Sequence, residues 1–433
     1  MQQSPYTITK NTSSNDISSQ IHKKRVLSLF SGCGGMDIGF EGGFQCLKRC
    51  INTDLHPDWV KYENEKWITV SNTKFETVFA NDIRPDAKSA WVSYFQKRYH
   101  DANKRYHLES IVDLVKRAKN GEPIFPDNID IVTGGFPCQD FSVSGKRQGF
   151  HSKKSHNGKK LESNEPSIEN RGQLYMWMRD VITLVQPSIF VAENVKGLAS
   201  LEDVKDIIEY DFANAADGGY LVIPARVLHA ANYGVPQSRE RIIFYGFKRS
   251  ALTSDALIYL TDLENHPDFD PYPIPTHNYS TIGTQLQPFV TCNEMLEDLD
   301  EPDTTTDISQ TKYSKAKYLP HGQGNIEIKL NSIAPTIRSE HHGNIEFRRL
   351  SKENGGMHED ELAKGLLQRR LTIRECARLQ TFPDDYQFIL PKTAENKNVS
   401  ASDAYKIIGN AVPCVLGYHI AQRLSENWDK YFK

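Results

Sequence analysis

Short apolar runs alternate with segments of helical spacing through the first half of the chain. The first run, Val26 to Phe30, breaks into a glycine-rich turn and is followed by a helix-compatible segment that reaches Phe40. This alternation predicts an α/β fold, in which a mostly parallel sheet is covered by helices and holds its ligand at the carboxyl ends of the strands. The other apolar runs of strand length are 44–52, 129–134, 188–193, 220–229 and 241–247, and 174–185 is the clearest helix.

The alternation is interrupted twice. Residues 86–119 are charged and helix-like, and we interpret them as an insertion into the pattern. After about Lys248 the alternation stops, and the proline-rich stretch 267–275 indicates a domain boundary. We therefore predict a polar tail over 1–24, a larger domain over 25–249 that is completed by 400–433, and a smaller second domain over 250–399.

The tail and the composition limit the class of protein. The first 25 residues are polar and lack an apolar core, which predicts a flexible tail rather than a secretory signal. No uninterrupted apolar stretch approaches the roughly 20 residues that span a bilayer, so we expect no membrane contact. A hydrophobic content of 38% in 433 residues is that of a globular chain with room for two or three domains.

Cysteine and charge narrow the class further. The seven cysteines are an odd set without a CxxC pair, which argues against a zinc site or a disulfide framework and predicts a reducing, cytoplasmic environment. A net charge of −3 means that any nucleic-acid contact must come from local clusters. We interpret the acidic stretch 294–307 as a solvated helix face rather than a metal site. One acid-free stretch between Phe141 and Leu161 contains Lys146, Arg147, Lys153, Lys154, Lys159 and Lys160.

The glycine turn is the first candidate for chemistry. Gly32 and Gly34 in Phe30-Ser31-Gly32-Cys33-Gly34 let the backbone approach a ligand closely, but the pattern is not the GxGxxG of a dinucleotide site. Asp54 follows the run 44–52, where a carboxylate can accept both ribose hydroxyls. Asp82 follows a third candidate strand, where it can accept from an adenine amino group. These acids suggest a nucleoside without phosphate, although each of them alone could merely cap a helix or turn.

A thiol and a carboxylate follow two later strands. Cys138, between Pro137 and Gln139, comes after a buried strand and before a basic, glycine-rich loop, a position that favours a thiolate nucleophile. Glu193 ends the next strand, so that both side chains can project into one cleft. Burial would favour the acid form of Glu193, which could then donate to a ring nitrogen. The alternatives are an inert buried cysteine and a capping glutamate.

Two arginines alternate along the start of a later strand. Arg239 and Arg241 stand close together at the start of this strand, and we expect only one of them to point into the cleft. Either could instead be a surface charge.

Taken together, these residues resemble the DNA (cytosine-5) methyltransferase family of bacterial restriction-modification systems. The resemblance extends in order from Val26 to Leu424 and rests on six motifs. They are Phe30-Ser31-Gly32-Cys33-Gly34, Pro137-Cys138-Gln139, Glu193-Asn194-Val195, Gln237-Ser238-Arg239-Glu240-Arg241, Arg369 through Glu375, and Gly409-Asn410-Ala411-Val412-Pro413.

The resemblance implies a Rossmann-like methyltransferase sheet in the larger domain and target recognition in the second. S-adenosylmethionine is the implied methyl donor, S-adenosylhomocysteine is the product, and no metal is expected. Asp54 would bind the ribose and Asp82 the adenine. Asn410, near the end of the chain, would also contact the donor. The full set implied to bind the donor is Phe30, Gly32, Gly34, Asp54, Asp82, Ile83 and Asn410.

The resemblance also implies a mechanism. The thiolate of Cys138 adds to C6 of cytosine, Glu193 hydrogen-bonds N3 and the amino group, and C5 becomes nucleophilic enough to take the methyl group. Arg241 would orient Glu193 and the base. Because C6 is inaccessible within a stacked duplex, the target nucleotide must be flipped out.

Duplex DNA is the implied substrate, with a cognate restriction endonuclease as functional partner, and we expect a monomer. The second domain is longer than the recognition segment of members that act on transfer RNA, which favours duplex DNA. The loop after Cys138 carries an insertion around 153–169. Residues implied to contact DNA are Gln139, Ser144, Arg239, Thr336 and Arg338, and further candidate base readers are Gln323, Glu340, His341, His342 and Asn344.

Two other classes of function stay open at this point. One is a catalytically inactive, sequence-specific DNA-binding paralogue, against which the intact Cys138, Glu193 and Arg241 argue. The other is a nicotinamide oxidoreductase, which the glycine pattern disfavours.

Overall fold

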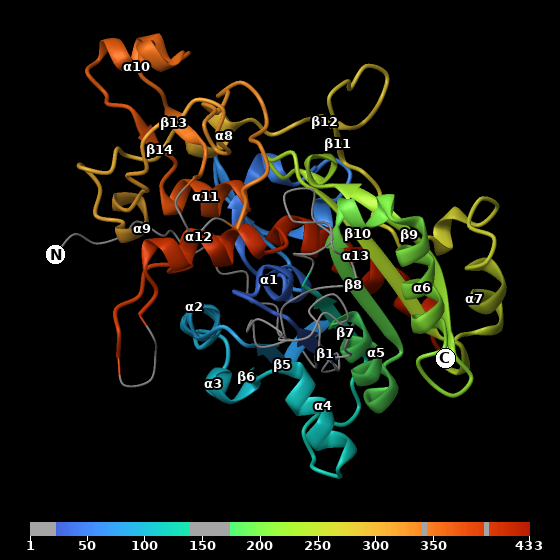
Figure 1. Cartoon of the computed structure of the whole chain (residues 1–433). Helices are drawn as coiled ribbons and strands as arrows, with labels where there is room; N and C mark the ends of the chain where they lie inside the picture. Colours follow the sequence, from blue (N-terminus) through green and yellow to red (C-terminus); the bar gives the residue numbers. More distant parts are fainter. Residues whose placement is uncertain (1–22, 138–173, 340–343, 394–397) are drawn as a thin grey trace, which may run out of the picture.

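A seven-stranded mixed sheet forms the centre of the molecule (Figure 1). The computed structural model describes residues 23–137, 174–339, 344–393 and 398–433. All neighbouring strands are parallel except where β10 is involved, which runs antiparallel to both β8 and β9. The predicted α/β fold with a mostly parallel sheet is confirmed. In spatial order the strands are β6 (Tyr106–Leu108), β5 (Phe75–Asp82), β1 (Lys24–Leu29), β7 (Ile131–Gly135), β8 (Ile189–Val195), β10 (Glu240–Lys248) and β9 (Tyr220–His229).

Helices cover both faces of this sheet. Successive residues of a strand point to opposite faces, so Val26 packs into one core while Leu27 packs into the other, and Ile243 and Ile242 divide in the same way. Strands buried on both faces are mostly apolar, which is why several of them are visible as nearly continuous runs in the sequence. One face is covered by α1 (Gly35–Glu41), α2 (Pro85–Phe95) and α13 (Cys414–Tyr431), and the other by α4 (Ile111–Lys119), α5 (Leu174–Val185) and α6 (Glu202–Ala213).

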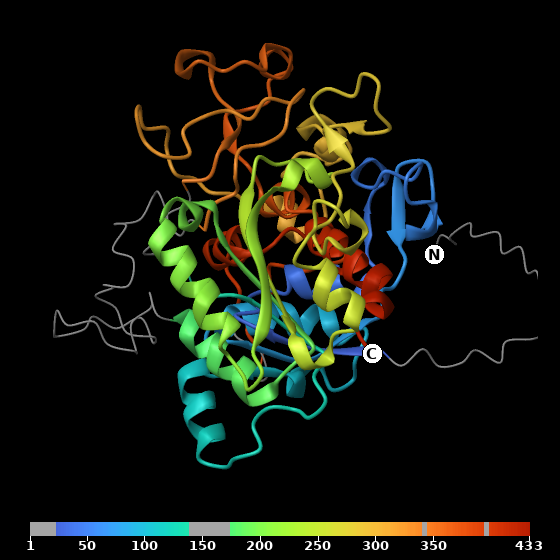
Figure 2. The same ribbon diagram turned by 90° about the vertical axis from the view of Figure 1, so that its right-hand side faces the viewer.

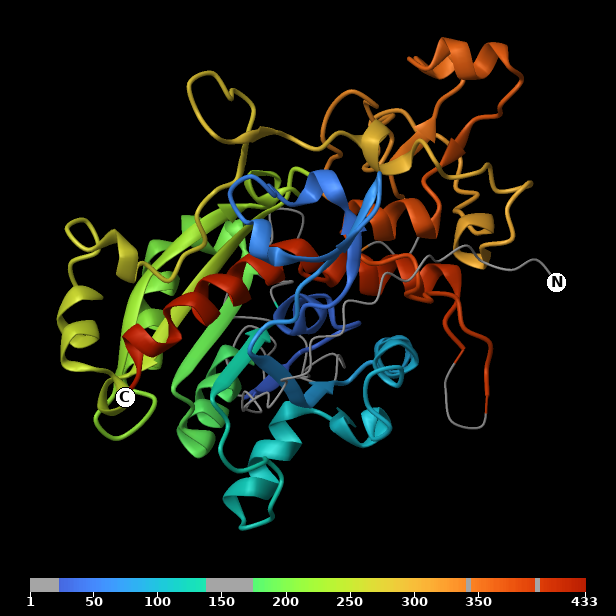
Figure 3. The same ribbon diagram turned by 180° about the vertical axis from the view of Figure 1, so that it is seen from behind.

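The run 44–52 is not a strand of the central sheet, contrary to the prediction. It forms the short β2 (Gln45–Leu47), which belongs to a separate antiparallel sheet with β4 (Trp67–Val70) and β3 (Val60–Glu63). This small sheet lies beside α13 at the back of the molecule (Figure 3). Lys48 and Arg49 interrupt the run, and a strand beside β1 must be apolar on both faces. The place beside β1 is taken by β5.

Residues 86–119 are also placed differently from the prediction. They are not an insertion, because they supply α2, α3 (Ala102–Arg105), α4 and the edge strand β6 of the central sheet. The strand β6 has only three residues, too few for a hydrophobic period to be recognised. The segment that interrupts the alternation of strands and helices is instead the small sheet between α1 and β5.

The second region, 250–399, consists mostly of loops. Its first part, with α7, lies beside the end of α13, and most of the rest lies above the sheet (Figure 2). After it, α12 (Ala401–Asn410) and α13 return to the larger domain. The elements of the second region are α7 (Ser254–Tyr259), β11 (His277–Asn278), β12 (Gln287–Pro288), α8 (Cys292–Leu296), α9 (Ile308–Thr311), β13 (Phe347–Arg349), α10 (Glu359–Ala363), β14 (Arg369–Arg370) and α11 (Ile373–Leu379). Short 3-10 helices occur at Lys48–Cys50, Pro57–Trp59, Lys196–Ser200, Ala230–Tyr233, Arg249–Ala251, Pro267–Phe269 and Lys352–Asn354.

Ion pairs replace regular structure in holding this region together. Glu301 accepts from Arg369 at 2.9 Å and from Arg349 at 2.8 Å, and Asp307 accepts from Arg374 at 2.6 Å. Although burial raises the pKa of Glu301, these hydrogen bonds outweigh it and lower that pKa to about 2. The acidic stretch 294–307 is therefore not a solvated helix face, because several of its carboxylates bind arginines of the domain interior.

The six cysteines in the described ranges are free and buried. Among the helices that the structure describes, none is long and apolar enough to span a membrane.

Candidate active site

The glycine turn after β1 has backbone angles that demand glycine. Gly32 and Gly34 have φ of 54° and 80°, and Phe30 is held at 53°, in a region that non-glycine residues rarely adopt. A Cβ atom on Gly34 would lie 2.5 Å from the ring of Trp91, so glycine is required there for packing. A Cβ atom on Gly32 would meet nothing within 4 Å. The turn therefore opens at Gly32 onto space that a ligand can fill.

Asp82 lies beside this turn. Asp82 ends β5, and its Oδ2 accepts a hydrogen bond from the Gly32 N–H at 3.1 Å. Burial raises the pKa of Asp82. Hydrogen bonds from the N–H groups of Arg84 and Gly32 lower this pKa, but burial has the larger effect. Ile83 follows with 42% of its surface exposed. Asp54 is exposed in a turn next to the small sheet, so the strand position that motivated its prediction is wrong.

Two buried tyrosines, which the sequence did not indicate, hold the carbonyl groups of the turn. The Tyr106 hydroxyl donates to the Gly32 carbonyl at 2.9 Å, and the Tyr386 hydroxyl donates to the Cys33 carbonyl at 2.7 Å. In a trans peptide the C=O and the following N–H point in opposite directions. A Gly32 carbonyl turned inward to Tyr106 therefore turns the Cys33 N–H outward, toward the open side of the turn.

Removing either hydroxyl is expected to weaken binding of the methyl donor more than it slows the reaction. We expect Tyr106→Phe and Tyr386→Phe each to raise the KM for S-adenosylmethionine about three- to tenfold, the effect of one hydrogen bond, with a much smaller change in kcat. Steady-state kinetics checks this. The matched control is Tyr220→Phe, which removes a buried hydroxyl bonded to the Pro187 carbonyl at 2.8 Å. An equal KM increase in that control would contradict the assignment.

A buried carboxyl group beneath the turn makes stability depend on pH. Asp37 accepts from Ser28 at 2.6 Å and from Trp91 at 2.7 Å, and burial raises its pKa to about 7 despite these bonds. Between pH of about 4 and 7 the folded state holds a proton that the unfolded state has lost. The free energy of unfolding therefore falls as pH rises through this window, by on the order of 1.4 kcal/mol per unit at most.

We expect Asp37→Asn to remove this part of the pH dependence. Thermal melts between pH 5 and 8 should show the wild type losing Tm relative to the variant as pH rises. Asp303→Asn, a substitution at an exposed position, is the control and should leave the wild-type slope unchanged. Parallel pH curves for the wild type and Asp37→Asn would contradict the prediction.

Glu193 and Arg241 meet at the carboxyl edge of the sheet. Arg241 Nε lies 2.7 Å from Glu193 Oε1, and Glu193 is only 8% exposed. Gly135 pairs with Glu193 across the strands, and a Cβ atom on Gly135 would lie 2.8 Å from Glu193 Oε2. Asn194 donates to the Phe136 carbonyl at 3.2 Å, which fixes the chain two residues before Cys138. Cys138, Gln139 and Ser144 themselves lie outside the described residues.

Arg239 is enclosed by protein. It is 1% exposed, and its guanidinium donates to the carbonyls of Ile337 and Gly409 at 3.1 and 3.0 Å. Its predicted contact with DNA is therefore wrong for this conformation, because the side chain is enclosed by protein. Arg239 instead joins the second domain to the end of α12. The expectation that only one of the two arginines faces the cleft agrees with this arrangement.

The remaining predicted residues of the second domain lie at this junction. Thr336 donates to the Ser238 carbonyl. Arg338 is engaged by Glu346 and by the Asn344 carbonyl at 3.0 and 3.1 Å, so base reading by its guanidinium would require these bonds to open. Asn410 is exposed at the end of α12. Glu340, His341 and His342 are outside the described residues.

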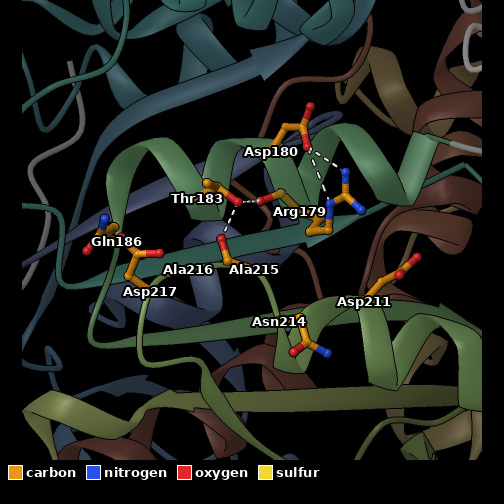
Figure 4. Close-up of a pocket in the computed structure, with 9 residues that line it drawn as sticks. All are labelled: Arg179, Asp180, Thr183, Gln186, Asp211, Asn214, Ala215, Ala216 and Asp217. Carbon is orange, nitrogen blue, oxygen red and sulfur yellow. Dashed lines mark hydrogen bonds and ion pairs between the residues drawn. The ribbon is translucent and has the colours of Figure 1, made fainter.

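The hollow in Figure 4 is at the opposite edge of the sheet. It encloses about 400 Å³ between the ends of α5 and α6, and Gln186 and Asp217 on its wall precede β8 and β9. None of the candidate site residues lines it, so it is not the reaction site. In the described part of the chain no cluster of three or more potential metal ligands occurs.

Comparison with known proteins identifies the class of this site. The chain matches the family of C-5 cytosine-specific DNA methylases over residues 24–426. It is 31% identical to the type II methyltransferase M.BspRI of Lysinibacillus sphaericus, over 99% of this chain and 87% of that protein. It is 30% identical to M.BsuRI of Bacillus subtilis, over 94% of this chain and 80% of that protein.

A solved structure agrees in fold. A methyltransferase of Entamoeba histolytica superposes with a TM-score of 0.51 at 13% identity, over 94% of this chain and 99% of that one. Fold and site thus define an α/β methyltransferase. The chain belongs to the C-5 cytosine-specific DNA methylase family and is an enzyme that methylates cytosine. Membership supports S-adenosylmethionine as the methyl donor and leaves no support for a nicotinamide oxidoreductase.

Proposed function

We propose that the chain transfers a methyl group from S-adenosylmethionine to C5 of a flipped-out cytosine within a short, specific sequence of duplex DNA. The observation that carries this proposal is the ion pair between Arg241 and Glu193, 2.7 Å long, on a strand end that adjoins the strand leading to Cys138. A carboxyl group held there by a fixed cation is suited to hydrogen-bond one edge of a pyrimidine while a thiolate attacks C6 from the face of the ring.

The turn at Gly32 fits the methyl donor. Its open side has room for a ligand, and the Asp82 carboxylate at the adjacent strand end can accept from the adenine amino group. We propose Phe30, Gly34 and the exposed Ile83 and Asn410 as the remaining walls of this site. Asp54 stays a prediction without a neighbouring strand to support it. When bound, the donor supplies the methyl group, and no role for a metal is proposed.

The chain's own residues then act in sequence. Cys138 forms a bond to C6 of cytosine, Glu193 hydrogen-bonds N3 and the amino group, and the resulting electron density at C5 takes the methyl group. Loss of the C5 proton restores the ring and expels the thiol. Arg241 keeps Glu193 in position throughout, and the contacts of Gln139, Ser144, Thr336 and Arg338 with DNA offset the few kcal/mol that flipping costs.

A protective role beside a restriction endonuclease follows from the similarity to type II methyltransferases, and we propose it for this chain together with action as a monomer. Bisulfite sequencing of plasmid from cells that express the chain tests the function, because it reports both the modified base and its flanking sequence. Transfer of labelled methyl groups in vitro gives the rate. A pure protein that binds duplex DNA specifically but never methylates it would favour the inactive paralogue instead.

A further inference from the structure

Two groups of basic side chains in the second domain differ in their partners. Most arginines of its interior are bound to carboxylates: Arg378, for example, pairs with Asp298 and Asp384 at 2.6 Å each. Their charge holds the domain together and is not available to a partner. The same holds for Arg348, Arg349, Arg369 and Arg374, which pair with Glu361, Glu301, Glu375 and Asp307.

Lys312, Lys315 and Lys317 form the second group, which we term the lysine row. All three are exposed, and within the described residues no carboxylate forms an ion pair with them. From Lys312 to Ile326 the sequence contains no acid at all. The lysine row is therefore a patch of positive charge without a carboxylate partner in the described structure, although the chain as a whole carries −3. Lys315 Nζ lies over the Tyr313 ring, 3.4 Å from its centre.

The backbone beneath the lysine row is fixed to the domain interior. The Lys312 carbonyl accepts from the Ile373 N–H at 3.0 Å, and the Ser314 N–H donates to the Tyr405 hydroxyl at 3.1 Å. Arg370 then donates to the carbonyls of Ala316 and Lys317 at 2.8 and 3.0 Å. Because these backbone groups are bound inward, the three lysine side chains are held on the outer side of the segment.

Arg370 also closes the acid-free loop that follows. It is 1% exposed and lacks a carboxylate partner in the described structure, and it donates to the Gly324 carbonyl at 2.7 Å and to Asn325 Oδ1 at 3.1 Å. One guanidinium thus binds both ends of the loop 316–325 and stacks over the Phe347 ring at 4.0 Å. The order imposed by Arg370 reduces the entropy that the lysine row would lose on binding a partner.

The loop that follows the lysine row adjoins the segment that leads to the candidate active site. A Cβ atom on Gly324 would lie 1.9 Å from the Asn344 carbonyl oxygen and 3.0 Å from the Arg338 guanidinium. Arg338 follows Thr336, which binds Ser238, and Ser238 lies three residues before Arg241. The orange loops that carry the row lie above the sheet in Figure 2. A duplex that presents a base to Glu193 would therefore pass close to this domain.

We propose that Lys312, Lys315 and Lys317 contact backbone phosphates of the duplex and provide sequence-independent affinity. This proposal rests on the proposed function, since it concerns the same substrate. A phosphate contact by lysine releases condensed counterions, so each one adds about 0.9 to the steepness with which affinity falls as log salt rises. Contacts of this kind fix the register of the protein on DNA while carrying no base information.

The test compares two double variants of equal charge. Lys315→Ala/Lys317→Ala removes two members of the row, and Lys352→Ala/Lys364→Ala removes two other exposed lysines of the same domain. Binding to a labelled duplex is measured by fluorescence anisotropy over about 50 to 200 mM salt. We expect the first variant to lower the salt slope by about 1.8, to weaken methylatable and unrelated duplexes equally, and to keep the wild-type Tm and KM for S-adenosylmethionine.

The outcomes separate this proposal from the proposed function. A wild-type slope in the row variant, a loss restricted to one DNA sequence, or an equal slope change in the control variant would each overturn the lysine row while leaving methylation intact. A slope change seen with duplex RNA but not with duplex DNA would also overturn it. Failure of the wild type to methylate any DNA would instead reject the proposed function.

Discussion

Cys138→Ala is expected to abolish methyl transfer while leaving the fold and the binding of both substrates intact. Cytosine C5 is a poor nucleophile, and without a thiolate at C6 the ring never gains the electron density that attack on the methyl group requires. We expect the rate to fall by at least about 10⁴-fold, the order observed when a covalent nucleophile is removed. Incorporation of labelled methyl groups into DNA measures this loss.

A buried thiol in the second domain gives the matched control. Cys292→Ala removes a free thiol from α8 in the second domain, and we expect it to lower Tm slightly while the methyl-transfer rate is kept. Trapping provides an independent reading, because duplexes with 5-fluorocytosine lack the proton whose loss releases the enzyme. A denaturation-stable adduct at Cys138 is expected. Substantial activity in Cys138→Ala, or an adduct at another cysteine, would contradict the covalent mechanism.

Most of the central strands were predictable because they form apolar runs that are largely buried in the sheet. The runs at 26–30, 129–134, 188–193, 220–229 and 241–247 correspond to β1, β7, β8, β9 and β10. The run 44–52 was misplaced because a short apolar stretch does not reveal its pairing partners, which tertiary contacts decide. The strand β6 was missed because three residues carry no recognisable period.

The residues of the candidate site were predictable only where they lie at the ends of neighbouring strands. Glu193 and Arg241 meet because β8 and β10 are adjacent and antiparallel, with Glu193 opposite Ile243. The tyrosine contacts with the glycine turn had no local signal, since Tyr386 is 353 residues from Cys33. The burial of Arg239 was equally hidden, because the carbonyls that enclose it are 98 and 170 residues away. Such contacts between residues far apart in the sequence are decided by the tertiary fold.

Glu193→Gln is expected to reduce kcat by about 10² to 10⁴, the usual contribution of a positioned acid or base, with little change in DNA affinity. The Arg241 Nε–H at 2.7 Å requires an acceptor, so the glutamine would turn its carbonyl oxygen to Arg241 and its NH₂ to the base. That NH₂ can donate to cytosine N3, but it can neither transfer a proton nor accept from the cytosine amino group. Single-turnover methylation at saturating DNA measures the loss.

Arg241 should act through the same carboxylate. We expect Arg241→Gln to lose activity to a similar extent, and Glu193→Gln/Arg241→Gln to lose little more than either single variant, because residues that work as a unit are strongly non-additive. Glu41→Gln is the control, since it changes a buried carboxylate that pairs with Arg98 at 3.0 Å elsewhere in the domain. It should lower Tm and keep kcat. Multiplicative losses in the double variant would mean that Arg241 contacts the substrate independently of Glu193, and full activity in Glu193→Gln would remove the carboxylate from the mechanism.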